Sequence, residues 1–256
     1  MHMDWKQQIQ SDQYEFPYHY LPVFEIDRCR LARQWNWAPS YLAALKIVHA
    51  WISELVGRSG GSWGHVDVGC GDGALLFHLS RIFPGSDGLS WTGVDYDEAA
   101  IAWARTMNAD RVRFLVADMA EVDARYNSAT LVEVAEHVPP DLLPDFIANL
   151  SRMLLPGAEL LLTVPHKNQS VQRKHYQHFD FGSVRSYFCP AFEVVSMHGF
   201  GRHTRLSRLI QRLILNRQYV FTWEPLSDLV TGQLSRKYLG EDGVSRIVAV
   251  LRKPGG

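Results

Sequence analysis

The chain has 256 residues, of which 46% are hydrophobic, and its formal net charge at pH 7 is −1. This length and apolar fraction are sufficient for one large hydrophobic core with additions, and the balanced charge excludes a chain-wide attraction to nucleic acid or to an anionic membrane. Cys29, Cys70 and Cys189 have no metal or redox spacing, which predicts reduced thiols in a cytoplasmic protein. The first residues are too polar for a signal peptide, and no apolar run reaches transmembrane length.

Residues 1–38 are rich in aromatic side chains, lack a clear periodicity and are interrupted by Pro17 and Pro22. We expect them to form an aromatic cap of short helices and loops over a ligand-binding mouth. Tyrosines in such a cap can line a pocket with apolar area and a hydroxyl group, and simple packing on the core is the alternative. The candidate substrate-contacting residues of the cap are Tyr14, Tyr18, His19 and Tyr20.

From residue 39 onwards the apolar pattern alternates between helical and strand-like segments. Ser40 can cap a helix over residues 39–56, and Pro156-Gly157 predicts a turn before a later strand. Strands are expected near 65–69, 91–95, 112–116, 129–133, 159–164, 192–197 and 246–252, and further helices near 73–83, 97–107, 141–154 and 181–188. This alternation predicts a parallel sheet with helices on both faces.

A glycine-rich turn follows the first strand of this series and reads Asp67-Val-Gly69-Cys-Gly71-Asp-Gly73. Glycines at alternate positions allow the backbone to turn sharply and allow a bulky ligand to approach the main chain. The spacing differs from the G-x-G-x-x-G dinucleotide fingerprint, and carboxylates at this place would repel a pyrophosphate. The turn therefore favours a ligand with a cationic amino-acid end, such as S-adenosylmethionine (SAM), over NAD.

Acidic residues also follow the next two predicted strands, at Asp95 and Asp118. Together with the glycine turn, over roughly residues 60–200, they make the chain resemble the class I SAM-dependent methyltransferases. The resemblance implies a Rossmann-like α/β fold with a seven-stranded, mostly parallel sheet, helices on both faces and an antiparallel last strand. It also implies that the glycines flank the methionine part of SAM, that Asp95 binds the ribose and that Asp118 contacts the adenine. The implied cofactor-binding residues are Asp67, Gly69, Cys70, Gly71, Gly73, Asp95, Tyr96, Asp118, Met119 and Glu133.

The loop after the predicted strand 129–133 reads Glu133-Val-Ala-Glu136-His137. This E-x-x-E-H pattern resembles the ubiquinone-pathway phenol O-methyltransferases and the small-RNA 3′-end 2′-O-methyltransferases, in which these residues can hold a divalent cation. Two carboxylates and an imidazole can bind Mg²⁺, Mn²⁺ or Zn²⁺, and such a cation lowers the pKa of a bound hydroxyl. The same residues also occur in metal-free methyltransferases, where the histidine acts as a base or shapes the pocket. The candidate metal ligands are Glu133, Glu136, His137 and His178.

A second histidine cluster follows the predicted strand 159–164, with His166 first and then His175-Tyr-Gln-His178-Phe179. It should face the same mouth, because open α/β sheets bind ligands beyond the carboxyl ends of their strands. Either His175 or His178 could complete a metal site or act as a base, and the alternative is that His178 packs on Phe179 and orders the loop. The segment resembles the H-x-x-H-F stretch of small-molecule and sugar methyltransferases more than its counterpart in the RNA enzymes. The candidate catalytic residues are Glu133, His137, His175 and His178, and His166 is a candidate substrate contact.

Residues 201–240 contain a basic amphipathic helix in which arginines alternate with leucine and isoleucine. It is interpreted either as a solvated face packed by its apolar stripe, or as a lid, a contact for an anionic substrate or a partner surface. The predicted division of the chain is the cap at 1–38, a SAM-binding core at 39–200, this basic insertion at 201–240 and the last core strand within 241–256.

Three functions are compatible with these features. The first is transfer of a methyl group to a hydroxyl of a small molecule, such as a sugar, phenol or lipid-linked metabolite. The second is 2′-O-methylation of a terminal RNA ribose, against which the near-neutral charge argues, since phosphate contacts dominate affinity for nucleic acids. The third is a SAM-binding partner protein without catalytic activity. The sequence leaves the acceptor and the oligomeric state open.

Overall fold

The computed structural model describes residues 4–12, 14, 19, 23–25, 28–30, 38–58, 62–83, 88–108, 111–215, 221 and 223–255. Two of the candidate substrate-contacting residues, Tyr18 and Tyr20, lie outside the described residues. The cap predicted for residues 1–38 is described in three elements, α1 (Trp5–Asp12) and the antiparallel pair β1 (Val23–Glu25) and β2 (Arg28–Arg30).

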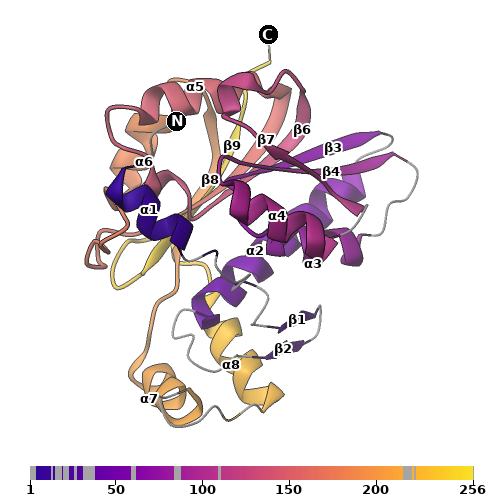
Figure 1. Ribbon diagram of the computed structural model, residues 1–256. Coiled ribbons are helices and arrows are strands. Elements are labelled where there is room, and N and C mark those ends of the chain that lie inside the picture. Colours follow the sequence, from indigo (N-terminus) through magenta and orange to yellow (C-terminus); the bar gives the residue numbers. More distant parts are fainter. Residues whose placement is uncertain are drawn as a thin grey trace.

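A seven-stranded sheet in the order β5-β4-β3-β6-β7-β9-β8 forms the centre of the molecule (Figure 1). Its strands are β3 (Trp63–Val68), β4 (Leu89–Asp95), β5 (Arg113–Val116), β6 (Tyr126–Val132), β7 (Leu154–Pro165), β8 (Glu193–Phe200) and β9 (Arg246–Arg252). Neighbouring strands from β5 to β7 pair in parallel, and only β9 runs antiparallel to its neighbours β7 and β8. The predicted Rossmann-like α/β fold, with one reversed last strand, is therefore confirmed.

Helices cover both faces of the sheet, and its central strands are buried on both sides. In β3, Val66 and Val68 belong to a core cluster shared with α5 (Leu143–Arg152) and α6 (Phe181–Phe188). Trp63 packs on the other face, with α2 (Ala38–Arg58), α3 (Ala74–Ile82) and α4 (Glu98–Asn108). Figure 1 shows α5 on one side of the sheet and α2, α3 and α4 on the other. Short 3₁₀ turns, η4 (Met119–Glu121) and η5 (Ala135–His137), follow β5 and β6.

The segment predicted as a basic insertion forms two helices, α7 (Arg205–Ile214) and α8 (Glu224–Leu234). A proline in the first turn of α8, Pro225, starts the second helix, since proline fits the first turn of a helix but not its interior. Helix α8 packs along α2, and the Lys46 ammonium lies 3.4 Å from the Asp228 carboxylate. None of the described helices is both long and apolar enough to cross a bilayer. The four-part division of the chain stays a prediction.

Candidate functional site

A cavity of about 680 Å³ opens at the edge of the sheet where the parallel strands end. The residues that follow β3, β4, β6 and β7 all reach it, because parallel strands direct their carboxyl ends to one edge. The first turns of α2 and residues of the N-terminal segment complete its wall. The topology thus brings both halves of the predicted site, the glycine turn and the histidine-rich loops, to a single cavity.

The glycine turn after β3 adopts a backbone that side chains disfavour. Gly69, Gly71 and Gly73 all have positive φ, and φ of Gly71 is 53°. The Gly71 N–H donates to a carboxylate oxygen of Asp95 at 2.8 Å, which fixes the turn against the end of β4. A Cβ at Gly71 would collide with the phenol group of Tyr14, so a larger residue there would require the Tyr14 side chain to move.

Two carboxylates line this part of the cavity in an unfavourable environment for negative charge. Asp67 is 3% exposed, and burial raises its pKa to about 7, opposed by a hydrogen bond from Thr130 Oγ1 at 2.7 Å. Burial raises the pKa of Asp95 to about 6, although backbone N–H groups of Asp97 and Gly71 donate to it. A cationic ligand in the cavity would relieve both costs, because it would stabilise the ionised carboxylates.

The hydrogen-bond chain beneath Asp67 was not predicted from the sequence. The Thr130 hydroxyl donates to Asp67, so it accepts from His65 Nε2 at 3.0 Å. His65 is neutral, since burial lowers its pKa to about 3, and its Nδ1 therefore accepts from the Ser128 hydroxyl at 2.8 Å. Alternate residues of β3 and β6 that share one face of the sheet build this chain. The one available signal in the sequence was polar side chains within predicted strands.

The other predicted cofactor residues divide into two groups. Cys70, which is buried, and Tyr96 both line the cavity. Asp118 and Met119 are not among the described residues that line it. Asp118 is exposed at the end of β5, where its carboxylate accepts the Ala120 N–H at 3.0 Å and caps η4. The adenine contact assigned to Asp118 stays a prediction.

Two described residues of the N-terminal segment, Tyr14 and His19, lie against the glycine turn. The His19 N–H donates to Asp72 at 3.1 Å, and the His19 ring lies 3.0 Å from the other oxygen of the same carboxylate. Trp103 on α4 donates its indole N–H to the Tyr14 carbonyl at 2.8 Å. Tyr14 and His19 both line the cavity, as predicted for the cap, but their contacts lie on the side of the glycine turn. Their role toward a substrate stays a prediction.

Glu133, at the start of the E-x-x-E-H loop, is held by the sheet. Its φ of 56° is the only positive value at a described residue other than glycine. Its carboxylate accepts from Arg246 Nε at 2.9 Å and from the Thr163 hydroxyl at 3.1 Å. Arg246 begins β9 and Thr163 is on β7, so the carboxylate joins the end of β6 to both strands. Although Glu133 lines the cavity, its oxygens are already engaged by protein donors.

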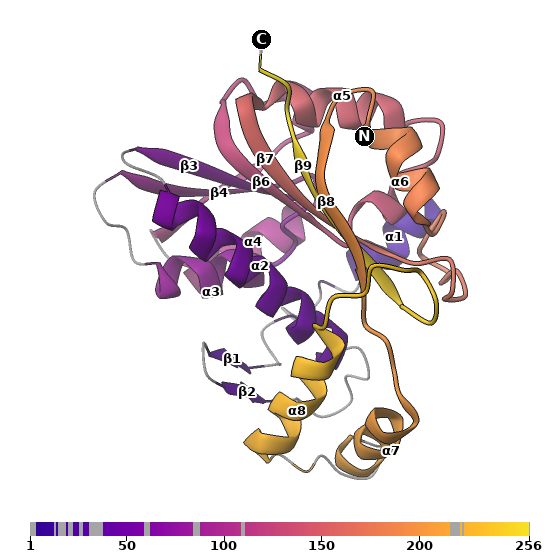
Figure 2. The same ribbon diagram turned by 180° about the vertical axis from the view of Figure 1, so that it is seen from behind.

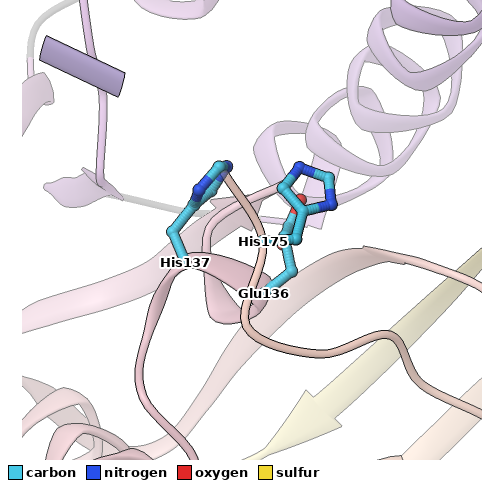
Figure 3. Close-up of side chains that lie close together, drawn as sticks. All are labelled: Glu136, His137 and His175. Atoms are coloured by element: carbon cyan, nitrogen blue, oxygen red, sulfur yellow. The ribbon is translucent and has the colours of Figure 1, made fainter. Parts of the chain in front are cut away.

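The structure brings Glu136, His137 and His175 together at the cavity wall (Figure 3). One potential ligand atom from each of the three side chains lies within 4.8 Å of the others. Glu136 is 1% exposed, and neither of its carboxylate oxygens has a hydrogen-bond partner among the described residues. Burial raises the pKa of Glu136 well above its ordinary value, and the nearby Glu133 carboxylate adds to this. Of the four candidate metal ligands, Glu136 and His137 are in this cluster, and His175 takes the place expected for His178.

Backbone carbonyls determine which nitrogen of each histidine carries the proton. His178 Nδ1 donates to the Gln169 carbonyl at 3.0 Å, which leaves Nε2 to accept from His175 Nδ1 at 2.8 Å. His137 Nδ1 donates to the Lys174 carbonyl at 3.2 Å. Burial lowers the pKa of all three rings, so each is neutral at pH 7. His137 and His175 therefore both retain a lone pair on Nε2, beside the buried carboxylate of Glu136.

His166 takes a structural position at the end of β7. Its Nε2 lies 3.1 Å from a Glu241 carboxylate oxygen, and its Nδ1 accepts the Asn168 N–H at 2.9 Å. It is not among the described residues that line the cavity, and its predicted substrate contact is untested. The segment 174–176 is also fixed by α1, since Lys6 Nζ donates to the His175 carbonyl at 2.6 Å and the Tyr176 hydroxyl donates to Asp4.

Comparisons with known proteins agree with this architecture. Residues 40–199 match the family model described as a methyltransferase domain. The fold is similar to that of the magnesium protoporphyrin IX methyltransferase from Synechocystis with bound SAM, at 13% identity and a TM-score of 0.60, with 98% of each chain covered. A TehB-like SAM-dependent methyltransferase from Corynebacterium glutamicum gives 14% identity and a TM-score of 0.56, with 96% of this chain and 99% of that chain covered.

A third similar structure is the N-methyltransferase NodS from Bradyrhizobium japonicum with bound S-adenosyl-L-homocysteine. It gives 14% identity and a TM-score of 0.52, with 82% of this chain and 88% of that chain covered. A search of the curated proteins found no match. Since the methyltransferase model covers more than half of the chain, the protein belongs to the class I SAM-dependent methyltransferases.

Proposed function

We propose that this methyltransferase transfers the methyl group of SAM to a hydroxyl oxygen of a small molecule. The observation that carries the proposal is the pair of Nε2 lone pairs on His137 and His175 beside the open carboxylate of Glu136. SAM already carries an activated methyl group, so the enzyme has to orient the acceptor and to remove its proton. The free Nε2 lone pair of a neutral imidazole can accept that proton, and a hydroxyl acceptor needs such a base most.

The proposal places SAM against the glycine turn and the acceptor against the histidine cluster. Asp67 and Asp95 would then face the cationic part of SAM, which their raised pKa values favour. The distance along the cavity wall from the glycine turn to the E-x-x-E-H loop is short, because β3 and β6 are adjacent strands. The cytoplasmic location and a biosynthetic role belong to the same proposal.

A divalent cation fits the same cluster. Two imidazoles with accessible Nε2 atoms and one unpartnered carboxylate are a typical ligand set for Zn²⁺ or Mn²⁺. Each Nδ1 is held by a partner that fixes the ring, as metal-binding histidines usually are. Glu136, His137 and His175 would hold the ion, which would supply Lewis-acid polarisation of the acceptor hydroxyl. Glu133 and His178 would orient the cluster, since their polar atoms already bind protein groups.

Single substitutions test the acceptor side separately from the cofactor side. We expect His175→Gln to keep the Kd for SAM within about twofold and to lower kcat by about 10²-fold or more, as for loss of a general base. His49→Gln is the matched control, because His49 stacks on Phe83 away from the cavity. Products from a panel of hydroxyl and amine acceptors are identified by mass spectrometry. Methyl transfer to nitrogen or carbon alone, or full turnover by His175→Gln, would contradict the proposal.

Metal dependence is measured independently of turnover. The chelated protein is titrated with Zn²⁺ and with Mn²⁺ by calorimetry, in the wild type and in Glu136→Gln. If the cluster holds a cation, the wild type binds one equivalent and the variant binds at least tenfold more weakly. If neither ion binds while methyl transfer persists, the metal part of the proposal is wrong and the histidines act as bases alone.

A further inference from the structure

The helix α7 presents an apolar stripe and a basic stripe side by side to solvent. Leu206, Leu209 and Leu213 are 63%, 56% and 56% exposed and share one face at i, i+3 and i+7 spacing. Arg205 and Arg208 are exposed on the adjacent face, about 100° around the helix. Ser207 and Ile214 are buried, so the helix is attached by a third stripe and keeps both others outward.

Exposed apolar side chains continue at described residues beyond α7. Six of the fourteen exposed large apolar side chains in the described part of the chain lie between residues 206 and 229, including Phe221, Trp223 and Leu229. Helix α7 contains three arginines and no acidic residue, although the whole chain has a net charge of −1, and the next acidic residues, Glu224 and Asp228, lie on α8. The basic charge is therefore local to α7, and exposed apolar side chains accompany it.

We propose that α7, with the exposed Phe221 and Trp223, forms a docking surface for an anionic phospholipid bilayer. An interfacial helix of this kind places leucine and aromatic side chains among the acyl chains while its arginines reach the lipid headgroups. The absence of acidic residues from the segment matches the negative surface charge of such a bilayer. Figures 1 and 2 both show α7 at the far end of the molecule from α5, where a flat surface can reach it.

Two other occupants fit this surface less well. In a symmetric dimer built on the leucine stripe, the arginine stripes of both copies would come together with no carboxylate in the helix to pair with them. A nucleic acid would bind the arginines but would leave the three exposed leucines without an apolar partner. A bilayer is the partner that satisfies both stripes at once.

The docking surface is connected to the catalytic cavity through two helices. Gln233 on α8 donates to the Thr204 hydroxyl at the start of α7, with a distance of 3.0 Å. Asp228 on α8 pairs with Lys46 of α2, and Tyr41 and Ala44 on α2 line the cavity. Docking through α7 would therefore hold the cavity near the membrane surface. The proposal does not depend on which atom of the acceptor is methylated.

Sedimentation with extruded vesicles tests the docking surface in the full-length chain. The vesicles contain either phosphatidylcholine alone or phosphatidylcholine with 30% phosphatidylglycerol. We expect binding to the anionic vesicles only, weakened by 0.5 M NaCl, with a blue shift of the tryptophan emission. Circular dichroism and the Kd for SAM show whether each variant below is folded.

Two double variants separate the two stripes. R205Q/R208Q should weaken binding roughly thirtyfold, since each basic residue near an anionic surface contributes about fivefold. L209Q/L213Q should weaken it at least about tenfold through loss of apolar insertion. The matched controls, R111Q/R125Q and L142Q/L155Q, change exposed residues elsewhere on the molecule and should bind like the wild type.

Several results would overturn the proposal. One is the absence of binding to anionic vesicles, and another is equal binding to both kinds of vesicle. Unchanged binding by folded R205Q/R208Q and L209Q/L213Q would place the contact elsewhere on the chain. Self-association of the lipid-free protein that L209Q/L213Q abolishes, measured by sedimentation velocity, would assign the surface to a second copy instead.

Discussion

Replacing Asp67 by asparagine should stabilise the SAM-free protein, and more strongly at high pH than at low pH. Asp67 is buried beneath the cavity, and its pKa of about 7 in the folded chain compares with an ordinary value of 3.8. The folded state therefore holds the Asp67 proton more tightly than the unfolded state. The resulting stabilisation is complete below about pH 4 and is lost as the pH rises through 7, because ionisation then occurs in the buried site.

The size of the effect follows from the difference between the two pKa values. Three pKa units correspond to about 4 kcal/mol of unfolding free energy over the full pH range. Roughly 1.5 kcal/mol of this stabilisation is already lost at pH 5, because Asp67 of the unfolded chain is ionised there. The remaining loss of unfolding free energy between pH 5 and pH 8 is roughly 2.5 kcal/mol. The hydrogen bond from Thr130 can be kept by the asparagine carbonyl, so packing changes little.

Urea unfolding of the wild type and of Asp67→Asn at pH 5 and pH 8 measures this quantity. The gain in unfolding free energy of Asp67→Asn over the wild type is compared between pH 5 and pH 8. Any effect of altered packing that does not depend on pH is the same at both values and drops out of this comparison. Asp123→Asn is the control, since Asp123 is exposed. If the gain in stability of Asp67→Asn is the same at pH 5 and pH 8, the argument about the buried carboxylate is wrong.

The same carboxylates and the glycine turn lead to three further predictions. The affinity for SAM, measured by calorimetry, should rise about tenfold from pH 5.5 to pH 8 and exceed the rise for S-adenosylhomocysteine, because the sulfonium cation favours ionised Asp67 and Asp95. Thr130→Val should lower the free energy of unfolding by about 1–3 kcal/mol at pH 8, where the folded chain holds Asp67 ionised and the carboxylate loses its hydrogen-bond donor. The loss should be smaller at pH 5, where Asp67 is protonated in the folded chain. Gly71→Ala should weaken SAM binding at least about tenfold, since φ of 53° is strained for alanine and its Cβ meets Tyr14.

The sheet and the glycine turn were predictable because local sequence determines them. Several buried strands contain short apolar runs, such as residues 160–162 of β7, and the turn residues that follow β3 mark its end. The prediction was wrong at Pro156-Gly157, which lies within β7 and not in a turn before it. Tyr126 pairs with Leu154 and Ser128 pairs with Glu159, so the four residues between Leu154 and Glu159 form a bulge. The bulge accommodates a proline and a glycine with φ of 79°, which regular pairing would exclude.

The partners within the histidine cluster could not be predicted, because loop contacts distant in sequence determine them. The Tyr176 N–H donates to the Glu136 carbonyl at 2.8 Å, and Lys6 of α1 holds the His175 carbonyl. These two contacts position His175 over Glu136 and leave His178 behind it as a hydrogen-bond partner. Spacing along the chain carries no information about either contact, so the sequence left His175 and His178 as alternatives, and the structure brings His175 next to Glu136 and His137.

The two glutamates of the E-x-x-E-H loop have different surroundings because the sheet register gives them different neighbours. Pro165 of β7 pairs with Arg246 of β9, which places the Arg246 guanidinium at the carboxyl edge of the sheet, within reach of Glu133. That ion pair and the Thr163 hydroxyl hold the backbone of Glu133 in its left-handed conformation. The turn at Glu133 directs the following residues into η5, where Glu136 is buried without a donor. The first carboxylate is therefore engaged by protein donors, whereas the second has no hydrogen-bond partner among the described residues, which is why the proposal assigns the acceptor side to Glu136.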